Sequence, residues 1–388
     1  MDNEIRQAFS VAYSFPVLFT RGAFDPKNPL LAQTLGRGGS RRHRVLVAVD
    51  SNVADATDGL LQRITAWFAA QGSALELAGP PFLVRGGEIC KSDPLEVSQL
   101  HDLVARYRID RQSFILAIGG GAVLDAVGFA AATAHRGVRL VRMPTTVLGQ
   151  NDAGIGVKNG INFLGRKNFL GSFAPPFAVI NDFDFLRTLP ARDLRAGMAE
   201  AVKVAAIKDA DFLHWIHTER RRLAAFAPDA VEELIRRCAK KHIEHVGGAD
   251  PFELGSARPL DFGHWTAHAL EELTGHELRH GEAVAIGCAL DSLYAHEVGL
   301  LSELELKKLL QTLEGLGFEV YHPALSRMDL REALAQFREH LGGELCLTVP
   351  HGLGRKVELN EIDLPLLGRC VEALAARSQH HAEQARTG

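Results

Sequence analysis

Three histidines, a glutamate and a lysine in the second half of the chain form the most specific candidate site in the sequence. HWTAH places His264 and His268 four residues apart on one face of a predicted helix, and His280 opens the next apolar stretch. Upstream, Glu200 and Lys203 interrupt an apolar helical face, where both are costly unless paired or bound to a metal. One glutamate and two histidines form an open site for a first-row metal. Any one of these histidines alone is more typical of an ordinary core or surface position, but the five residues together indicate function.

A glycine run in the first half offers a candidate nucleotide site. Gly119, Gly120 and Gly121 follow a predicted buried strand and precede a helix, whose free N–H groups can approach a pyrophosphate. The spacing is not GxGxxG, and a plain tight turn explains the run nearly as well. Asp50 ends an earlier strand, where it either binds a ribose hydroxyl or caps the next helix.

A second glycine-rich segment, 152–168, combines glycines with cationic and amide side chains. This composition is typical of a loop that holds a phosphate, or of a surface loop with solvated lysines. The polar residues of the segment that we single out are Asp152, Lys158, Lys167 and Asn168.

The elements that must position these residues fall into two groups. Short apolar runs at 44–50, 113–121 and 138–146, with a weaker alternation at 11–19, predict strands, and 53–72 predicts a helix. After residue 185, helical periodicity dominates 191–246, 262–298, 302–316 and 328–341, and a polar, frayed tail follows from 376. The pattern predicts an α/β fold: a Rossmann-like parallel-sheet domain at 1–185 that binds the cofactor, and a mostly α-helical domain at 186–388 that binds metal and substrate. We expect the active site in the cleft between them.

Composition excludes several classes of protein. The chain has 388 residues, 46% of them hydrophobic, and a formal net charge of −4, so bulk charge attracts neither nucleic acid nor an anionic membrane. Its five cysteines are scattered without a CxxC pair, which argues against a disulfide framework. No basic leader and no 18-residue apolar run are present. We expect a cytoplasmic enzyme that acts on a small molecule.

With these residues in hand, the chain resembles the sugar phosphate cyclases, whose best-known member is 3-dehydroquinate synthase. Ten collinear motifs between about residues 44 and 355 carry the resemblance: GGEICK (86–91), GGGAVLD (119–125), MPTT (143–146), QND (150–152), KNGIN (158–162), GRKN (165–168), LRTLP (186–190), GMAEAVK (197–203), DFGHWTAH (261–268) and HGEAV (280–284). The resemblance is strongest to the cyclases that use sedoheptulose 7-phosphate, such as 2-epi-valiolone synthase and 2-epi-5-epi-valiolone synthase.

The resemblance implies two cofactors, NAD and a divalent metal, zinc or cobalt. Glu200, His264 and His280 match the family's metal ligands. The positions that contact NAD in the family correspond to Asp50, Asn52, Glu88, Lys91, Gly120, Gly121, Asp125, Thr145, Thr146, Asp152, Lys167 and Thr188. The catalytic positions correspond to Asp152, Lys158, Lys203 and His268.

The resemblance also implies a phosphate clamp formed by Lys158, Asn168 and Arg136. In the family the arginine reaches across a dimer interface, so we expect a homodimer. The implied reaction oxidises a secondary alcohol transiently, eliminates phosphate, reduces the ketone again and closes a ring by an aldol addition. The net result is cyclisation with loss of phosphate, without net oxidation.

Departures from 3-dehydroquinate synthase bear on the substrate. Asp261 stands before FGH where that enzyme has asparagine, and His340 stands where it has lysine. Arg258 is displaced by one residue, and the position of another expected lysine falls near Ile243, beside Lys240 and Lys241. Asp261 would repel a substrate carboxylate by roughly 4 kcal/mol at 4 Å and an effective dielectric near 20. A carboxylate acceptor suits hydroxyl groups instead, which favours sedoheptulose 7-phosphate.

Three alternatives remain open. The first is a 3-dehydroquinate synthase with an unusual carboxylate pocket. The second is a metal-dependent polyol dehydrogenase of related fold, although such enzymes carry Asp with His four residues on, and here Val204 follows Glu200 at that spacing. The third is a non-catalytic binding protein that keeps the fold, which the intact candidate site disfavours.

Overall fold

A computed structural model describes residues 4–248, 250–253, 260–340 and 343–387. The chain divides into two compact units, which we describe separately. The first unit comprises Met1–Pro144 and Val157–Asp182, and the second comprises Thr145–Gly156 and Phe183–Gly388. The chain therefore leaves the first unit after Pro144, returns to it at Val157 and leaves it again after Asp182.

The first unit contains a seven-stranded sheet in which every pair of strands is parallel. The strand order is β1-β9-β6-β5-β2-β3, and β4 also pairs with β2. The strands are β1 (Val17–Thr20), β2 (His43–Asp50), β3 (Leu75–Leu77), β4 (Phe82–Val84), β5 (Phe114–Gly119), β6 (Arg139–Pro144) and β9 (Ala178–Asp182).

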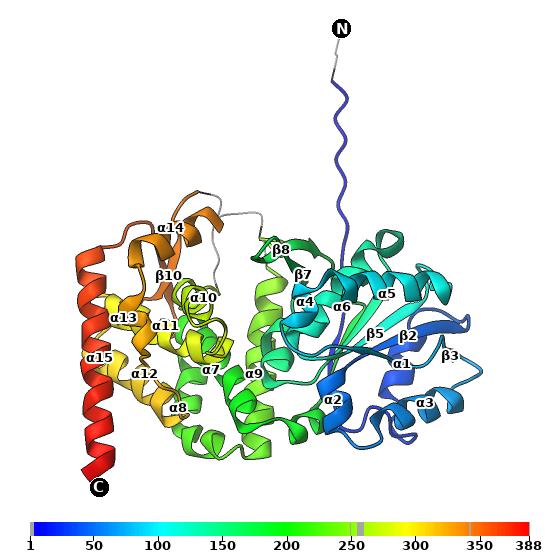
Figure 1. The fold of residues 1–388 in the computed structure, drawn as a ribbon, viewed down its shortest axis with the longest axis horizontal. Coiled ribbons are helices and arrows are strands. Elements are labelled where there is room, and N and C mark those ends of the chain that lie inside the picture. Colours follow the sequence, from blue (N-terminus) through cyan, green and yellow to red (C-terminus); the bar gives the residue numbers. More distant parts are fainter. Residues whose placement is uncertain (1–3, 249, 254–259, 341–342, 388) are drawn as a thin grey trace. The chain divides into compact units, whose positions relative to one another are not determined.

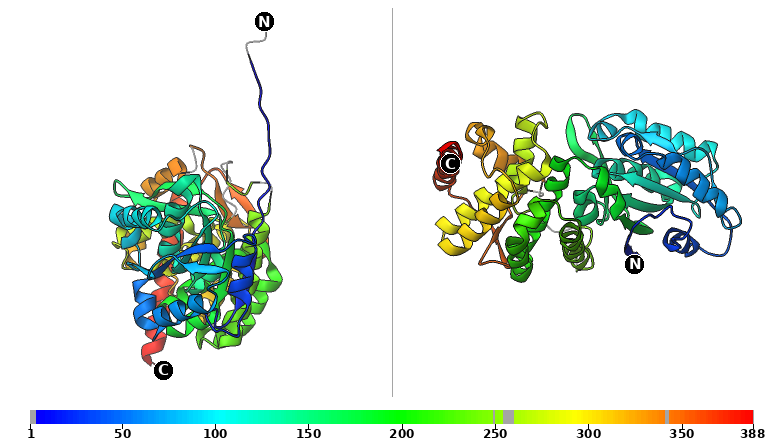
Figure 2. Two further views of the ribbon diagram at one scale, coloured as in Figure 1. Left: turned by 90° about the vertical axis from the view of Figure 1, so that its right-hand side faces the viewer. Right: turned by 90° about the horizontal axis from the view of Figure 1, so that it is seen from below.

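Both faces of this sheet are covered by helices, as Figures 1 and 2 show. On one face, Leu46 of β2 and Ile115 of β5 pack in a core with Leu100 and Leu124 from the helices above them. Burial on both faces explains the near-continuous apolar character of β2 and β5. The helices of the unit are α1 (Leu30–Gly36), α2 (Ser51–Ala56), α3 (Leu60–Ala70), α4 (Ile89–Ser92), α5 (Pro94–Arg106), α6 (Gly121–Thr133) and η1 (Ala134–Arg136).

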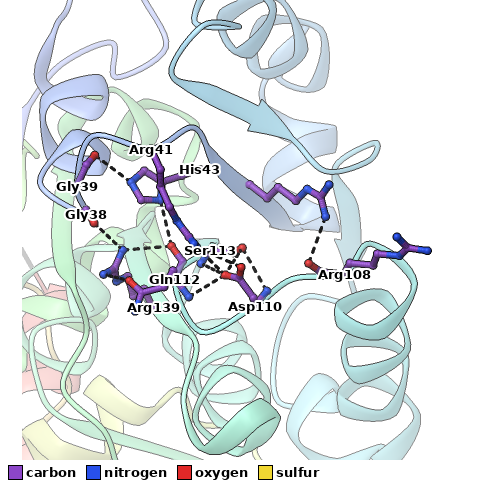
Figure 3. A network of polar contacts seen from close by, with 10 residues as sticks. Gly38, Gly39, Arg41, His43, Arg108, Asp110, Gln112, Ser113 and Arg139 are labelled. Atoms are coloured by element: carbon purple, nitrogen blue, oxygen red, sulfur yellow. Dashed lines mark hydrogen bonds and ion pairs between the residues drawn. The ribbon is translucent and has the colours of Figure 1, made fainter.

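A polar network closes the edge of the sheet at which its strands begin (Figure 3). Arg139, the first residue of β6, donates hydrogen bonds to the carbonyl oxygens of Gly38 and Gln112 at 3.0 and 3.1 Å. The Asp110 carboxylate accepts from the backbone of Ser113, just before β5, and from Arg41. These contacts fix the loops at the amino ends of the strands. A ligand can therefore bind at the opposite edge of the sheet, where the strands have their carboxyl ends.

The second unit is mostly helical, and its central helix α7 is buried over most of its length. Its helices are α7 (Ala191–Lys208), α8 (Ala210–Ala224), α9 (Pro228–Val246), α10 (His264–Leu273), α11 (His280–Glu297), α12 (Glu303–Gly315), α13 (Pro323–Arg327), α14 (Leu330–His340) and α15 (Leu364–Thr387). Two short helical segments, η2 (Gly149–Ala153) and η3 (Phe183–Thr188), and a hairpin of β10 (Leu347–Pro350) and β11 (Lys356–Leu359) complete the unit.

The predicted fold class is confirmed: a parallel sheet with helices, then a mostly helical region. Three details of the prediction were wrong. The helix expected at 53–72 is two helices, interrupted at Gly59, which has a left-handed φ of 67°. The loop expected at 152–168 instead contains the strands β7 (Lys158–Phe163) and β8 (Arg166–Phe173). The tail expected to fray continues helix α15 to Thr387.

No helix in the described part of the chain combines the length and the apolar character needed to cross a membrane.

Candidate active site

Three helices of the second unit bring together the residues that could hold a metal. Glu200 comes from the buried middle of α7, and His264 and His280 open α10 and α11. One ligand atom from each of the three residues lies within 4.8 Å of the others. The Oε1 atom of Glu200 lies 3.4 Å from Nε2 of His280 and 3.7 Å from Nε2 of His264.

These distances suit a metal better than direct hydrogen bonds. Metal–ligand bonds of about 2.0–2.1 Å at tetrahedral angles place neighbouring ligand atoms about 3.3–3.4 Å apart. The three residues present one carboxylate and two imidazoles, a donor set that fits zinc or cobalt and leaves a coordination position open. The residues present therefore fit a divalent metal.

Both histidines are oriented through their other ring nitrogen. Nδ1 of His264 lies 3.2 Å from the carbonyl oxygen of Phe262, and Nδ1 of His280 lies 3.3 Å from Oε2 of the buried Glu271. A proton on each Nδ1 leaves each Nε2 with a free lone pair for a metal. Sequence reasoning missed Glu271. Glu271 lies seven residues after His264 and three after His268 in the same predicted helix, and that spacing was the available signal.

Lys203 is the buried cation of the site. Its Nζ lies 2.5 Å from Oε2 of Glu200, one turn earlier on α7, and both side chains are almost fully buried. Burial alone would lower the pKa of Lys203, but the attraction of Glu200, Asp152 and Asp261 raises it well above its usual value. For Glu200 burial would raise the pKa, and Lys203 and His280 outweigh burial and lower it. Lys203 is therefore charged at neutral pH.

Asp152 lies on η2, a single π-helical turn, a distortion that is frequent at functional sites. Its Oδ1 lies 2.7 Å from Nε2 of His242, a buried residue of α9. Burial would raise the pKa of Asp152, but His242 attracts the carboxylate and the net effect lowers that pKa. Lys241, which lies beside the position of the lysine expected near Ile243, pairs with Asp209. His242 interrupts the buried stripe of α9 four residues after Cys238, and that spacing could have revealed it.

Asp261 and His268 lie close to this cluster. Asp261 is half-buried, and its charge contributes to the raised pKa of Lys203. His268 is exposed, with its ring centroid 5.6 Å from that of His264 and 6.3 Å from that of His280. Arg258 lies outside the described residues, and of His340 only the backbone is described, as the last residue of α14.

In the first unit, the candidate cofactor residues gather at the carboxyl ends of β2 and β5. The Asp50 carboxylate caps α2 by accepting from the backbone N–H of Asn52 at 2.9 Å, and burial raises its pKa. A Cβ at Gly86 would lie 2.3 Å from the side chains of both Asp50 and Asn52, so any other residue there would displace these two side chains. Gly120 is the N-cap of α6 and Gly121 its first residue. The helix thus starts without a side-chain cap, and its backbone N–H groups could bind a phosphate.

A chain of polar contacts around the buried Lys91 extends from this edge to the β7–β8 hairpin. Nζ of Lys91 lies 2.8 Å from the Asp125 carboxylate and also hydrogen-bonds to the side chain of Asn168 in β8. Burial would lower the pKa of Lys91, but Asp125 and Glu88 raise it. The Glu88 carboxylate accepts from Asn162 of β7 at 3.3 Å. These contacts connect Glu88, Lys91 and Asp125 with the hairpin, which carries Asn168.

Arg142 is a buried residue of this region that sequence reasoning missed. Its guanidinium donates to the carbonyl oxygen of Lys158 at 2.8 Å and to the side chain of Asn159 at 2.6 Å. Burial lowers its pKa to about 10. Arg142 therefore anchors the start of β7, where Lys158 lies. Arg142 interrupts the apolar run at 138–146, and that interruption was the available signal.

The other candidates lie on turns and on the hairpin. Arg136 is exposed with a left-handed φ of 62°, and Lys158 and Lys167 are exposed on β7 and β8. In the second unit, the buried hydroxyl of Thr145 has no hydrogen-bond partner among the described residues, as expected for a group that binds a ligand. Oγ1 of Thr146 accepts from the Gly149 N–H at 2.9 Å, and Thr188 donates to the Phe185 carbonyl oxygen.

Two family models match the part of the chain that contains most of the candidate site residues. The model described as 3-dehydroquinate synthase N-terminal matches residues 81–196, and the model described as 3-dehydroquinate synthase C-terminal matches residues 197–339. The chain belongs to the 3-dehydroquinate synthase family. The resemblance found in the motifs is thereby confirmed, and the chain is a sugar phosphate cyclase of the 3-dehydroquinate synthase type.

Relatives within the family include enzymes named for different products. The chain is 34% identical over 361 residues to a 2-epi-5-epi-valiolone synthase of Streptomyces glaucescens, covering 92% of this chain and 90% of the relative. It is 38% identical over 291 residues to a 3-dehydroquinate synthase of Pseudomonas aeruginosa, covering 74% and 78%. A solved 2-epi-5-epi-valiolone synthase of Streptomyces hygroscopicus subsp. jinggangensis, with NAD⁺ and Zn²⁺ bound, is 31% identical at a TM-score of 0.85, covering 96% of this chain and all of that one.

Proposed function

We propose that this family member converts sedoheptulose 7-phosphate to a C7 cyclitol, 2-epi-valiolone or 2-epi-5-epi-valiolone, with elimination of phosphate. The choice of substrate rests on Asp261, a half-buried carboxylate close enough to Lys203 to contribute to the raised pKa of that lysine. The reaction class is that of a carbon–oxygen lyase. The substrate is oxidised transiently, loses phosphate, is reduced again and closes by an intramolecular aldol addition, so that no net oxidation occurs.

The charge around Lys203 supports a neutral substrate end. Three carboxylates, those of Glu200, Asp152 and Asp261, raise the pKa of this lysine. With a metal held by Glu200, the remaining carboxylates leave little net positive charge for an additional substrate carboxylate. A carboxylate about 4 Å from Asp261 would cost roughly 4 kcal/mol at an effective dielectric near 20, whereas hydroxyl groups can donate to Asp261.

We assign the two cofactors to the two groups of residues described above. NAD⁺ supplies the transient oxidation, and a divalent metal, zinc or cobalt, polarises the oxygen of the reacting alcohol and ketone. Glu200, His264 and His280 would hold the metal. Asp50, Asn52 and the amino end of α6 would bind the dinucleotide, and Lys91 and Asp125 would fix the neighbouring side chains. The hydroxyls of Thr145, Thr146 and Thr188 and the side chains of Glu88 and Lys167 complete that set.

The remaining residues would bind the substrate and stabilise charge. Lys203, charged and buried, would stabilise a developing oxyanion by hydrogen bonding. His268, exposed beside the two ligand histidines, would exchange a proton with a substrate hydroxyl. Asp152, fixed by His242, would orient the reacting end of the substrate. Lys158, Asn168 and Arg136 would hold the phosphate, with Arg136 contributed by the other subunit of a homodimer in the cytoplasm.

Release of inorganic phosphate by the purified protein with NAD⁺ and Co²⁺ or Zn²⁺ tests the proposal. Sedoheptulose 7-phosphate and 3-deoxy-arabino-heptulosonate 7-phosphate are compared in parallel, and NMR of the product names the cyclitol. Turnover of the first substrate supports the proposal. The variant D261N should lose activity toward sedoheptulose 7-phosphate. It should still bind the metal as the wild type does, because Asp261 is not one of the proposed ligands.

3-Dehydroquinate synthase is the second candidate, favoured by the 38% identity to the enzyme of Pseudomonas aeruginosa. It predicts turnover of the acidic heptulosonate phosphate alone. That result would overturn the assignment of Asp261 and leave the family, the metal ligands and the cofactor intact.

A further inference from the structure

We propose that Asp291 is a positioning residue for the metal centre. It holds the turn that carries His264, so that this histidine faces Glu200 and His280. This inference rests on the proposed metal site. It adds a residue that does not touch the metal but binds the two neighbours of the proposed ligand His264. Asp291 belongs to α11, eleven residues after His280, and is 1% exposed.

Two hydrogen bonds join Asp291 to the turn. Its Oδ2 accepts from the backbone N–H of Gly263 at 2.9 Å, and its Oδ1 accepts from Nε1 of Trp265 at 2.8 Å. Gly263 and Trp265 are the residues on either side of His264. Both oxygens of one carboxylate therefore bind the flanks of a proposed ligand, and both bonds lie in the buried interior.

The backbone of the same turn lies directly against α11. Gly263 has a φ of 77°, and a Cβ there would lie 2.6 Å from the amide nitrogen of Cys288. A Cβ at Gly287 would lie 2.0 Å from the carbonyl oxygen of Gly263. Two glycines thus permit a backbone-to-backbone contact one turn before Asp291. This contact fixes the position of the turn along the axis of α11. The hydrogen bonds of Asp291 fix the orientation of the turn.

This arrangement has a direct consequence for the ligand. Because residues 263 and 265 are both bound on the α11 side, the side chain of His264 between them projects toward Glu200, 3.7 Å from Nε2 to Oε1. His280 belongs to the same helix as Asp291. One helix therefore supplies one proposed ligand directly and orients another through a carboxylate, which fixes their separation.

Net stability is a poor explanation for a carboxylate at this place. Gly263 and Trp265 are the polar partners that the structure gives Asp291 within the described chain, and both are uncharged donors. A buried carboxylate without a cation is costly compared with an apolar side chain of similar size. Burial accordingly raises the pKa of Asp291. Its particular contribution is geometric, because only a carboxylate accepts from two donors at once in this arrangement.

Metal affinity measured separately from turnover tests the proposal. The protein is stripped with a chelator and titrated with Co²⁺, whose visible absorption reports the coordination geometry, and thermal unfolding is recorded in the chelator. In D291N one of the two acceptor oxygens becomes a donor, and W265F removes the indole donor. The control is S292A, because Ser292 is the buried neighbour of Asp291 and bonds within its own helix, to the Cys288 carbonyl oxygen at 2.6 Å.

We expect D291N to bind Co²⁺ about 10–100-fold more weakly than the wild type with an altered absorption spectrum, and W265F to show a smaller loss. S292A should bind as the wild type does. Equal Co²⁺ affinity and an unchanged spectrum in D291N, with or without a lower unfolding temperature, would overturn the inference and leave the metal site standing. Failure of the wild type itself to bind Co²⁺ would overturn the proposed metal site and this inference together.

Discussion

Replacing Asp291 with asparagine should remove one component of the pH-dependent stability of this protein. Burial raises the pKa of this carboxyl group from 3.8 to about 7, and the Trp265 and Gly263 donors offset burial only in part. The unfolded chain therefore loses this proton near pH 4, and the folded protein loses it near pH 7. Between these values the folded state holds one more proton than the unfolded state, so the wild type gains stability as the pH falls.

The size of the effect follows from the two pKa values. The free energy of unfolding changes by about 1.4 kcal/mol per pH unit wherever the two states differ by one proton. Integrated from about pH 8 to about pH 5.5, the wild type should gain about 2 kcal/mol relative to D291N. The hydrogen bond lost in D291N adds a constant offset, which does not depend on pH.

Urea unfolding of both proteins across this pH range, with a chelator present, measures the difference. The chelator removes the pH dependence of metal binding, and all other titrating groups cancel between the two proteins. S292A, measured in parallel, should follow the wild type at every pH. A difference between the wild type and D291N that stays constant across the range would refute the argument that this carboxyl is buried without a compensating charge.

Three further changes separate the roles of the site residues. H264A should lose the bound metal, measured by elemental analysis, and all turnover. A variant that keeps the metal content of the wild type would remove His264 from the ligand set. K203M should lower the free energy of unfolding in chelator by about 3–5 kcal/mol, because it leaves Glu200 buried without its partner; an unchanged urea midpoint would contradict this pairing. H242F should bind Co²⁺ normally yet lose about 10–100-fold in kcat/KM, because Asp152 loses a charge-assisted contact, and full activity would show that this contact does not orient Asp152.

Local patterns predicted the fold class well. The strands β2, β5 and β6 were visible as short apolar runs because each is buried on both faces, and the helices of the second unit were visible from their periodicity. The β7–β8 hairpin was not visible, because β8 is exposed over most of its length and lacks the alternation of a half-buried strand. Length and polarity alone made the segment 152–168 look like a loop.

The candidate site was predictable to the extent that its residues interrupt apolar patterns. Glu200 and Lys203 on α7 are conspicuous for this reason, and the structure pairs them. His242, Glu271 and Asp291 are equally buried, but what each does depends on the helix that packs against it. Lys241 and His242 are neighbours on α9 but have different partners. Lys241 pairs with Asp209, whereas His242 contacts Asp152. Spacing along one helix reveals which residues share a face and does not reveal their partners.

The segment Thr145–Gly156, which belongs to the second unit although the chain returns to the first unit after it, bears on how such enzymes can be recombined. A chimaera of two family members joined at a single junction after the last strand of the sheet would take Asp152 from one parent and His242 from the other. Exchange of the complete second unit needs three junctions, at 144/145, 156/157 and 182/183. Libraries built on these junctions would transfer the π turn, α9 and the proposed metal ligands together from one parent.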